Sequence, residues 1–175
     1  GVCIPEKHYM VNLESRLKEI KSLVDTDSYF VINKARQYGK TTTLRALYKY
    51  LQNEYYVSLM DFQMFGNADF SSEHAFAEAF SHTFTDLFEY KKSQETDDLE
   101  NAIRILEQDT KMPEFALRLL FKDLKKVCQA ADKPIVLMID EVDSASENQV
   151  FVDFLAQLRS MYLSRDIQPA FKSVI

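Results

Sequence analysis

Residues 34–42 lie between a segment with strand character and a segment with helix character. The apolar run Tyr29-Phe30-Val31-Ile32 precedes this stretch, and apolar residues at helical spacing follow it, at Leu44, Leu47, Tyr48 and Leu51. The stretch is therefore predicted to be the turn between a buried strand and a helix N-terminus. The first backbone N–H groups of a helix lack partners, and the helix dipole favours negative charge there. A turn of this kind can therefore bind a phosphate group.

The residue types within this stretch suit a phosphate and a metal ion. Gly39 lets the backbone approach a phosphate oxygen, Lys40 can reach the β- and γ-phosphates, and the Thr41 hydroxyl can ligate magnesium. The usual phosphate-loop pattern opens with a glycine five residues before the second one, where this chain has Lys34. Gly-Lys-Thr alone is a weak signal, because an ordinary surface helix can begin with it. The phosphate-site interpretation therefore needs support from another part of the chain.

That support comes from a second strand-like segment, which ends in two acidic residues. Five apolar residues, 135–139, follow a proline and precede Asp140 and Glu141, which is typical of a central parallel strand. Asp140 is expected to hold magnesium through water, and Glu141 to polarise the water that attacks the γ-phosphate. Open α/β sheets bind ligands at the carboxyl ends of their strands, so both segments can serve one site. The alternative for the two carboxylates is a solvated loop after a core strand.

Strand and helix patterns along the chain predict an α/β three-layer sandwich, with a mostly parallel sheet and helices on both faces. Short apolar runs predict strands near residues 29–32, 55–62, 135–139 and 171–175. Helical spacing predicts helices over residues 12–23, 71–90, 99–106, 113–130 and 146–162, and one that ends near residue 52. Asn12 is the expected N-cap of the first helix, after an irregular lead-in over residues 1–11. The phenylalanines of residues 71–90 share one helical face and are expected in the core.

Composition bounds the class of protein. The chain has 175 residues with 46% hydrophobic and 27% charged, enough for one globular domain. The net charge of −6 implies no strongly basic face, so nucleic-acid binding gains no support. The two cysteines, Cys3 and Cys128, make a disulfide framework unlikely and fit a reducing cytoplasm. No apolar run approaches membrane-spanning length and no signal peptide is visible, so a cytoplasmic protein without a membrane partner is expected.

The run Arg36-Gln37-Tyr38-Gly39-Lys40-Thr41-Thr42, together with Ile139-Asp140-Glu141-Val142-Asp143, resembles the bacterial AAA-like ATPases of the P-loop superfamily with an additional catalytic glutamate. In those relatives, Arg-x-aromatic-Gly-Lys-Thr replaces the glycine-opened loop, so Lys34 fits the family. The resemblance implies ATP and magnesium as cofactors. It assigns the whole run from Arg36 to Thr42 to the nucleotide, Thr41 and Asp140 to magnesium, and Lys40 and Glu141 to catalysis. The Asp-Glu pair suits ATP, and the chain has no Asn-Lys-x-Asp motif for guanine.

The resemblance also carries expectations about the fold. It implies a P-loop sandwich in which residues 171–175 form a central strand, between the strand that ends at Asp140 and the strand of residues 29–32. Residues 1–175 would be the N-terminal part of such an ATPase domain, without the end of its sensor strand and its lid. A protein partner or a further C-terminal domain is then expected.

Several assignments stay open. The expected function is magnesium-dependent ATP binding and hydrolysis; the alternative is a nucleotide-gated signalling or scaffold module with little turnover. A nucleotide or small-molecule kinase is disfavoured, because Asp140-Glu141 suits water activation. One of His8, Tyr9 and Met10 could flank the adenine or simply pack on the core. Asp61, Asp143, Arg159 and Arg165 could serve the site or be ordinary cap, loop or surface residues.

Overall fold

The computed structural model describes residues 5–32, 40–89 and 96–175, with side chains for all of these except residues 5–12, Lys40 and Glu89. Three strands form a parallel sheet in the order β1 (Tyr56–Asp61), β2 (Ile135–Asp140) and β3 (Ser173–Val174). The same ranges contain one 3-10 turn, η1 (Phe62–Met64), and seven helices: α1 (Pro5–Asp25), α2 (Lys40–Leu51), α3 (Glu73–Glu89), α4 (Asp97–Asp109), α5 (Leu117–Ala130), α6 (Val142–Ala145) and α7 (Gln149–Leu163).

The last strand of the chain lies inside the sheet. On one side β3 pairs with β2, and on the other side Val174 forms a parallel bridge with Tyr29. The implied position of residues 171–175, between β2 and the segment before residues 34–42, is therefore confirmed. The predicted strand at residues 29–32 is reduced to this single bridge, with Phe30 N–H donating to the Val174 carbonyl at 2.9 Å. Val31 is 86% exposed, so this run lacks the burial that holds a central strand in place.

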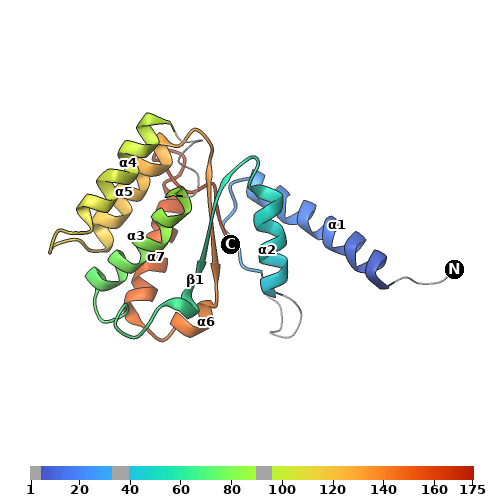
Figure 1. Ribbon diagram of the computed structural model, residues 1–175, viewed down its shortest axis with the longest axis horizontal. Helices are drawn as coiled ribbons and strands as arrows, with labels where there is room; N and C mark the ends of the chain where they lie inside the picture. Colours follow the sequence, from blue (N-terminus) through green and yellow to red (C-terminus); the bar gives the residue numbers. More distant parts are fainter. Residues whose placement is uncertain (1–4, 33–39, 90–95) are drawn as a thin grey trace.

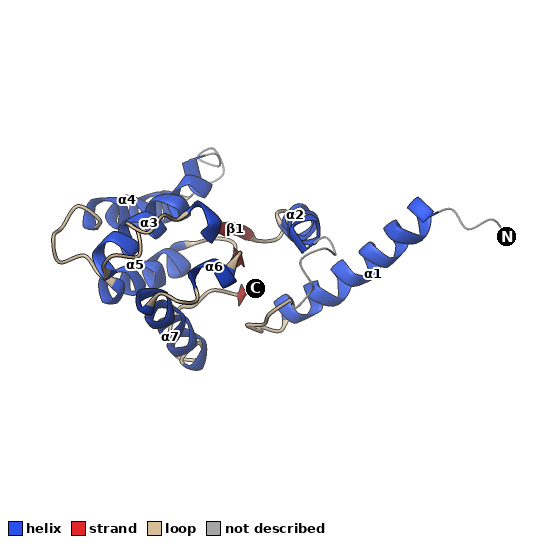
Figure 2. Cartoon of the chain, turned by 90° about the horizontal axis from the view of Figure 1, so that it is seen from below, coloured by secondary structure: helices blue, strands red, loops and turns tan. Residues whose placement is uncertain are grey.

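Strand β2 separates two cores and gives the molecule three layers. All six of its residues are buried, and successive side chains point to opposite faces. Ile135, Leu137 and Ile139 pack in a core covered by α3, α4, α5 and α7. Val136 and Met138 pack in a second core with α1 and α2. Figures 1 and 2 show these two groups of helices on opposite sides of the strands, so the predicted layered α/β arrangement is present.

Aromatic side chains fill the first core. Four phenylalanines at helical spacing on α3 are fully buried: Phe76, Phe80, Phe84 and Phe88. Neighbouring rings along α3 contact one another, and some of them also contact the rings of Phe62 and Phe154. The ring centroids in these contacts are 5.0–6.3 Å apart. Offset and edge contacts of this kind stabilise aromatic pairs beyond the area they bury. The prediction that this helical face is core is confirmed.

Three helix starts differ from the predictions. Helix α1 begins at Pro5 and not at Asn12, because a proline is well accommodated in a first turn and the following residues favour helix. Helix α5 begins at Leu117, so Pro113 lies in the preceding turn. Helix α7 begins after Asn148, and Ser146 belongs to the end of the short helix α6, which was not predicted. No helix in the described ranges is long and apolar enough to cross a membrane.

Candidate functional site

The two segments predicted to bind phosphate and metal meet at the carboxyl ends of the strands. The Thr41 hydroxyl, in the first turn of α2, donates a hydrogen bond to Asp140 Oδ2 at 3.1 Å. These residues are 99 positions apart in the chain. They meet because the parallel sheet brings the end of β2 to the same edge as the start of α2.

Asp140 is held on both of its oxygens. Its residue is only 6% exposed, and a buried carboxylate is stable only when hydrogen-bonded. Oδ2 accepts from Thr41, and Oδ1 accepts from the backbone N–H of Glu141 at 2.9 Å. The Asp140 side chain is thus fixed between the N-terminus of α2 and the backbone of Glu141.

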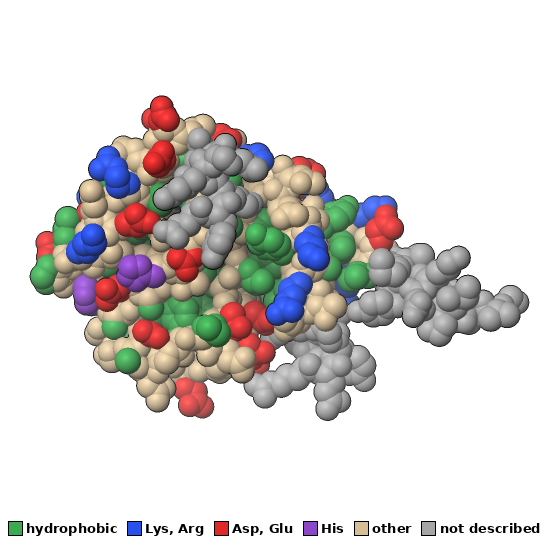
Figure 3. Space-filling view, in the orientation of Figure 1, with side chains coloured by type: hydrophobic (Ala, Val, Ile, Leu, Met, Phe, Trp, Pro, Cys, Tyr) green, Lys and Arg blue, Asp and Glu red, His purple; other side chains and the backbone are tan. Residues whose placement is uncertain are grey.

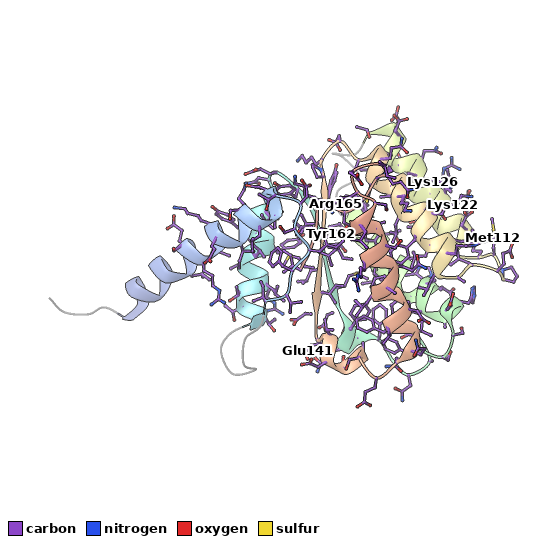
Figure 4. The ribbon with its side chains drawn as sticks, turned by 180° about the vertical axis from the view of Figure 1, so that it is seen from behind. Met112, Lys122, Lys126, Glu141, Tyr162 and Arg165 are labelled. Atoms are coloured by element: carbon purple, nitrogen blue, oxygen red, sulfur yellow. The ribbon has the colours of Figure 1, made fainter. Side chains whose placement is uncertain are left out.

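Glu141 is half-buried, and its backbone has a left-handed conformation with φ 58° and ψ 38°. Its carbonyl oxygen accepts two hydrogen bonds from Ser144, one from the backbone N–H at 3.1 Å and one from the hydroxyl at 2.7 Å. Figure 4 shows Glu141 where β2 ends and α6 begins. The polar residues after Asp140 therefore form a fixed turn, which was predicted only as a polar run.

Helix α2 presents its N-terminus at this edge. Thr41 and Thr42 are exposed in its first turn, and that turn contains no acidic residue to repel an anion. Figure 3 shows acidic side chains gathered between α6 and the start of α2, with Lys or Arg side chains over α2 beside them. Arg36, Gln37, Tyr38 and Gly39 lie outside the described residues, as do the side chains of Lys40, His8, Tyr9 and Met10.

Two of the other candidates have ordinary structural roles. Asp61 lies beside Asp140 in the sheet register, but its Oδ1 accepts from Gln63 N–H at 2.9 Å and caps η1. Arg165 stacks on the Tyr162 ring at 3.8 Å from the centroid and donates to the Tyr162 carbonyl. Figure 4 shows Tyr162 and Arg165 near the end of α7 that lies away from Glu141. Arg165 is therefore not brought to the site, whereas Asp61 lies next to Asp140 and uses one of its oxygens to cap η1.

Two cavities flank the strands. A mainly apolar one of about 300 Å³ lies beside Asp140 and includes Asp143 in its lining, with Phe30, Val31, Ile32, Leu44, Ile139, Val142, Leu155, Val174 and Ile175. A larger one, of about 800 Å³, is lined by residues at the amino ends of β2 and β3, including Pro134 and Lys172. The larger cavity is at the opposite edge of the sheet from Asp140. Its size therefore does not mark it as the nucleotide site.

Thr41 and Asp140 fit magnesium better than they fit a metal bound by protein ligands alone. Magnesium keeps several waters and is usually held by one or two protein oxygens and by substrate phosphates. A threonine hydroxyl beside a carboxylate is such a set. Among the residues whose side chains are described, no group of three His, Cys, Asp or Glu could hold a metal ion.

Comparison with known proteins agrees with this geometry. The model of one protein family, described as an AAA-like domain, matches residues 7–174, which include both segments of the site. Neither a curated protein nor a solved structure gives a significant match to the chain. The family match supports a nucleotide-binding module of the ATPase type. The chain belongs to the AAA-like domain family.

Proposed function

We propose that this chain binds ATP with magnesium at the carboxyl ends of its strands and hydrolyses it. The observation that carries the proposal is the hydrogen bond between Thr41 and Asp140, since it joins the predicted phosphate segment to the predicted metal segment. The strand order is also the order that a P-loop sandwich requires, with β3 between β2 and Tyr29. The proposal includes the P-loop class of fold and a cytoplasmic location.

Each residue has a distinct role in this proposal. Backbone N–H groups at the start of α2 bind phosphate oxygens, together with residues 36–39 and Thr42, and Lys40 neutralises their charge. The Thr41 hydroxyl and the Asp140 carboxylate would hold magnesium, which when bound would offset negative charge on the nucleotide. Glu141 orients a water molecule and accepts its proton as the water attacks. The hydrogen bond from the Glu141 backbone N–H to the Asp140 carboxylate orients that carboxylate relative to the backbone of Glu141.

Calorimetry and phosphate release together test the proposal. Titration of the chain with Mg-ATP is expected to show binding, and Lys40→Ala is expected to abolish it. Glu141→Gln is expected to retain binding while lowering the rate of phosphate release by about 100-fold or more, because it removes the base. Equal hydrolysis by the wild type and Glu141→Gln would refute the role of Glu141. Binding with negligible turnover by the wild type would instead favour the nucleotide-gated module.

A further inference from the structure

Glu141 has a backbone conformation that few residues of its kind adopt. Two non-glycine residues in the described part of the chain have positive φ, Asp27 and Glu141. Asp tolerates the left-handed region because its short side chain bonds locally, whereas Glu has no such advantage. A strained conformation of this kind persists only where the surrounding structure holds it, and it is often found at functional sites. The contacts that hold Glu141 are therefore informative.

Ser144 donates both hydrogen bonds that the described residues make to the Glu141 carbonyl. Its N–H and its hydroxyl both donate to the Glu141 carbonyl, at 3.1 and 2.7 Å, while the Glu141 N–H donates to Asp140. A carbonyl oxygen has two lone pairs, so Ser144 uses the full capacity of this acceptor. Rotation of Glu141 away from its left-handed conformation would move this carbonyl and break both bonds.

Ser144 is itself held by a turn that is anchored in the core. Ala145, the next residue, is fully buried, and α6 packs against η1. The Ala145 carbonyl accepts from the backbone N–H and the side-chain amide of Asn148, at 3.0 and 3.2 Å. The Ser144 hydroxyl is nevertheless on the exposed surface, so its removal leaves the packing of Ala145 intact.

We infer that Ser144 is a positioning residue for the water-activating Glu141. This inference rests on the proposed hydrolysis. A general base acts only within hydrogen-bond reach of the water that it activates, and small displacements of such a group cost much of the rate. By fixing the φ and ψ of Glu141, the Ser144 hydroxyl fixes the direction in which the carboxylate leaves the backbone. In this role Ser144 acts through Glu141 and is not itself a catalytic residue.

Ser146 provides a matched control, because its hydroxyl makes the same kind of bond in the same turn. It donates to the Asp143 carbonyl at 2.9 Å, three residues earlier, and it is also exposed. Bonds from Ser hydroxyls to such carbonyls are common and do not by themselves indicate function. The two serines differ in the residue whose carbonyl they bond, which is Glu141 for Ser144 and Asp143 for Ser146.

The test compares Ser144→Ala, Ser144→Thr and Ser146→Ala in the whole chain. For Ser144→Ala we expect kcat to fall roughly fivefold, the usual effect of one hydrogen bond, with unchanged Kd for Mg-ATP. Ser144→Thr restores kcat because it restores the hydroxyl, and Ser146→Ala behaves as wild type. Backbone NMR chemical shifts of Glu141, which report its φ, change in Ser144→Ala only.

Three results would overturn the inference: an unchanged kcat in Ser144→Ala, an equal loss in Ser146→Ala, or a weaker Kd that accompanies the loss. Unchanged Glu141 shifts in Ser144→Ala would also overturn it. If the wild type releases no phosphate, the proposed function fails, and the NMR shifts alone decide whether Ser144 positions Glu141.

Discussion

The Thr41 hydroxyl, in the first turn of α2, donates a hydrogen bond of 3.1 Å to Asp140, the last residue of β2. The bond couples the start of α2 to the end of β2, although the two residues are 99 positions apart in the chain. In the proposed site, the Thr41 hydroxyl and the Asp140 carboxylate would hold magnesium. The hydroxyl at position 41 should therefore matter for the metal more than for the fold.

Thr41→Ala should weaken binding of ATP in the presence of magnesium by about tenfold, the equivalent of roughly 1.4 kcal/mol. In the presence of a chelator, the mutant and the wild type should bind ATP with similar affinity, because the hydroxyl acts through the metal. Thr41→Ser keeps the hydroxyl and serves as the control. Calorimetric titrations under the two conditions measure the difference, and an equal loss with and without magnesium would argue against a metal ligand.

Glu141→Gly should stabilise the fold while abolishing hydrolysis. Glycine adopts φ near 58° without the steric cost that a Cβ carries in the left-handed region, about 1 kcal/mol. For a domain of this size, we expect Tm to rise by about 2–4 °C for each kcal/mol of strain removed. The larger conformational entropy of glycine in the unfolded chain offsets part of this rise. Glu141→Ala keeps the strain and should show no rise. Thermal unfolding of both variants checks this, and a lower Tm for the glycine variant would show that Glu141 is not strained.

Tyr55→Phe should destabilise the contact between α1 and the turn that precedes β1 by about 1 kcal/mol at neutral pH, since it removes a hydrogen bond to a charged group that is partly exposed. The Tyr55 hydroxyl donates to Asp25 Oδ1, and this bond is the main cause that lowers the pKa of the Asp25 carboxyl, with Lys21 adding to it. A lowered pKa contributes stability above the usual value of 3.8, which is lost as pH falls through the folded pKa.

The difference in unfolding free energy between the wild type and Tyr55→Phe should therefore shrink in acid, as Asp25 becomes protonated. Denaturant titrations at a series of pH values from neutral to about pH 3 measure it. Tyr48→Phe, on the neighbouring helix α2, is the control. A difference that stays constant down to low pH would mean that the Tyr55 bond does not depend on the charge of Asp25.

Asp123→Asn should stabilise the protein at neutral pH. The Asp123 side chain is only 1% exposed; Oδ1 pairs with Lys126 Nζ at 2.9 Å, whereas Oδ2 is buried without a hydrogen-bond partner among the described residues. Burial raises the pKa of this carboxyl, and nearby Asp109 adds to the rise while Lys126 opposes it. A raised pKa means that the folded protein binds this proton more tightly than the unfolded chain does. Stability is then lost as pH rises from the usual value of 3.8 through the folded pKa.

Asparagine is neutral and can donate its amide to Asp109, so we expect a gain of about 1 kcal/mol and a flatter dependence of stability on pH. Asp153→Asn, on a half-buried position of α7, controls for the change in net charge. Chemical denaturation at pH 5 and pH 8 checks the prediction. A loss of stability at both values would show that the ion pair with Lys126 outweighs the cost of burying the carboxylate.

The strands and the two halves of the site could be predicted because their signals are local. The apolar run before Asp140 and the helical spacing after Thr41 each identify an element, and parallel strands place their carboxyl ends together. The position of β3 followed from the family resemblance and not from its own residues. The turn at Glu141 could not be predicted. The left-handed backbone of Glu141 is held by contacts with Ser144 and Asp140, and there is no glycine at this position to indicate such a conformation. Likewise, the weak pairing of residues 29–32 reflects the exposure of Val31, a tertiary property.

Strand β2 contributes side chains to two separate cores, and Asp140 is its last residue. A change of side-chain volume in either core would shift the strand that carries this carboxylate. Examples are a smaller residue in place of a phenylalanine on α3, or a larger residue in place of a leucine on α2. The helices of the two cores therefore need not be complementary in shape to each other, but each group must be complementary to its own face of β2. A substitution in one core should therefore be tolerated only where the other core accommodates the same displacement of β2, so the position of Asp140 constrains residues that do not contact it.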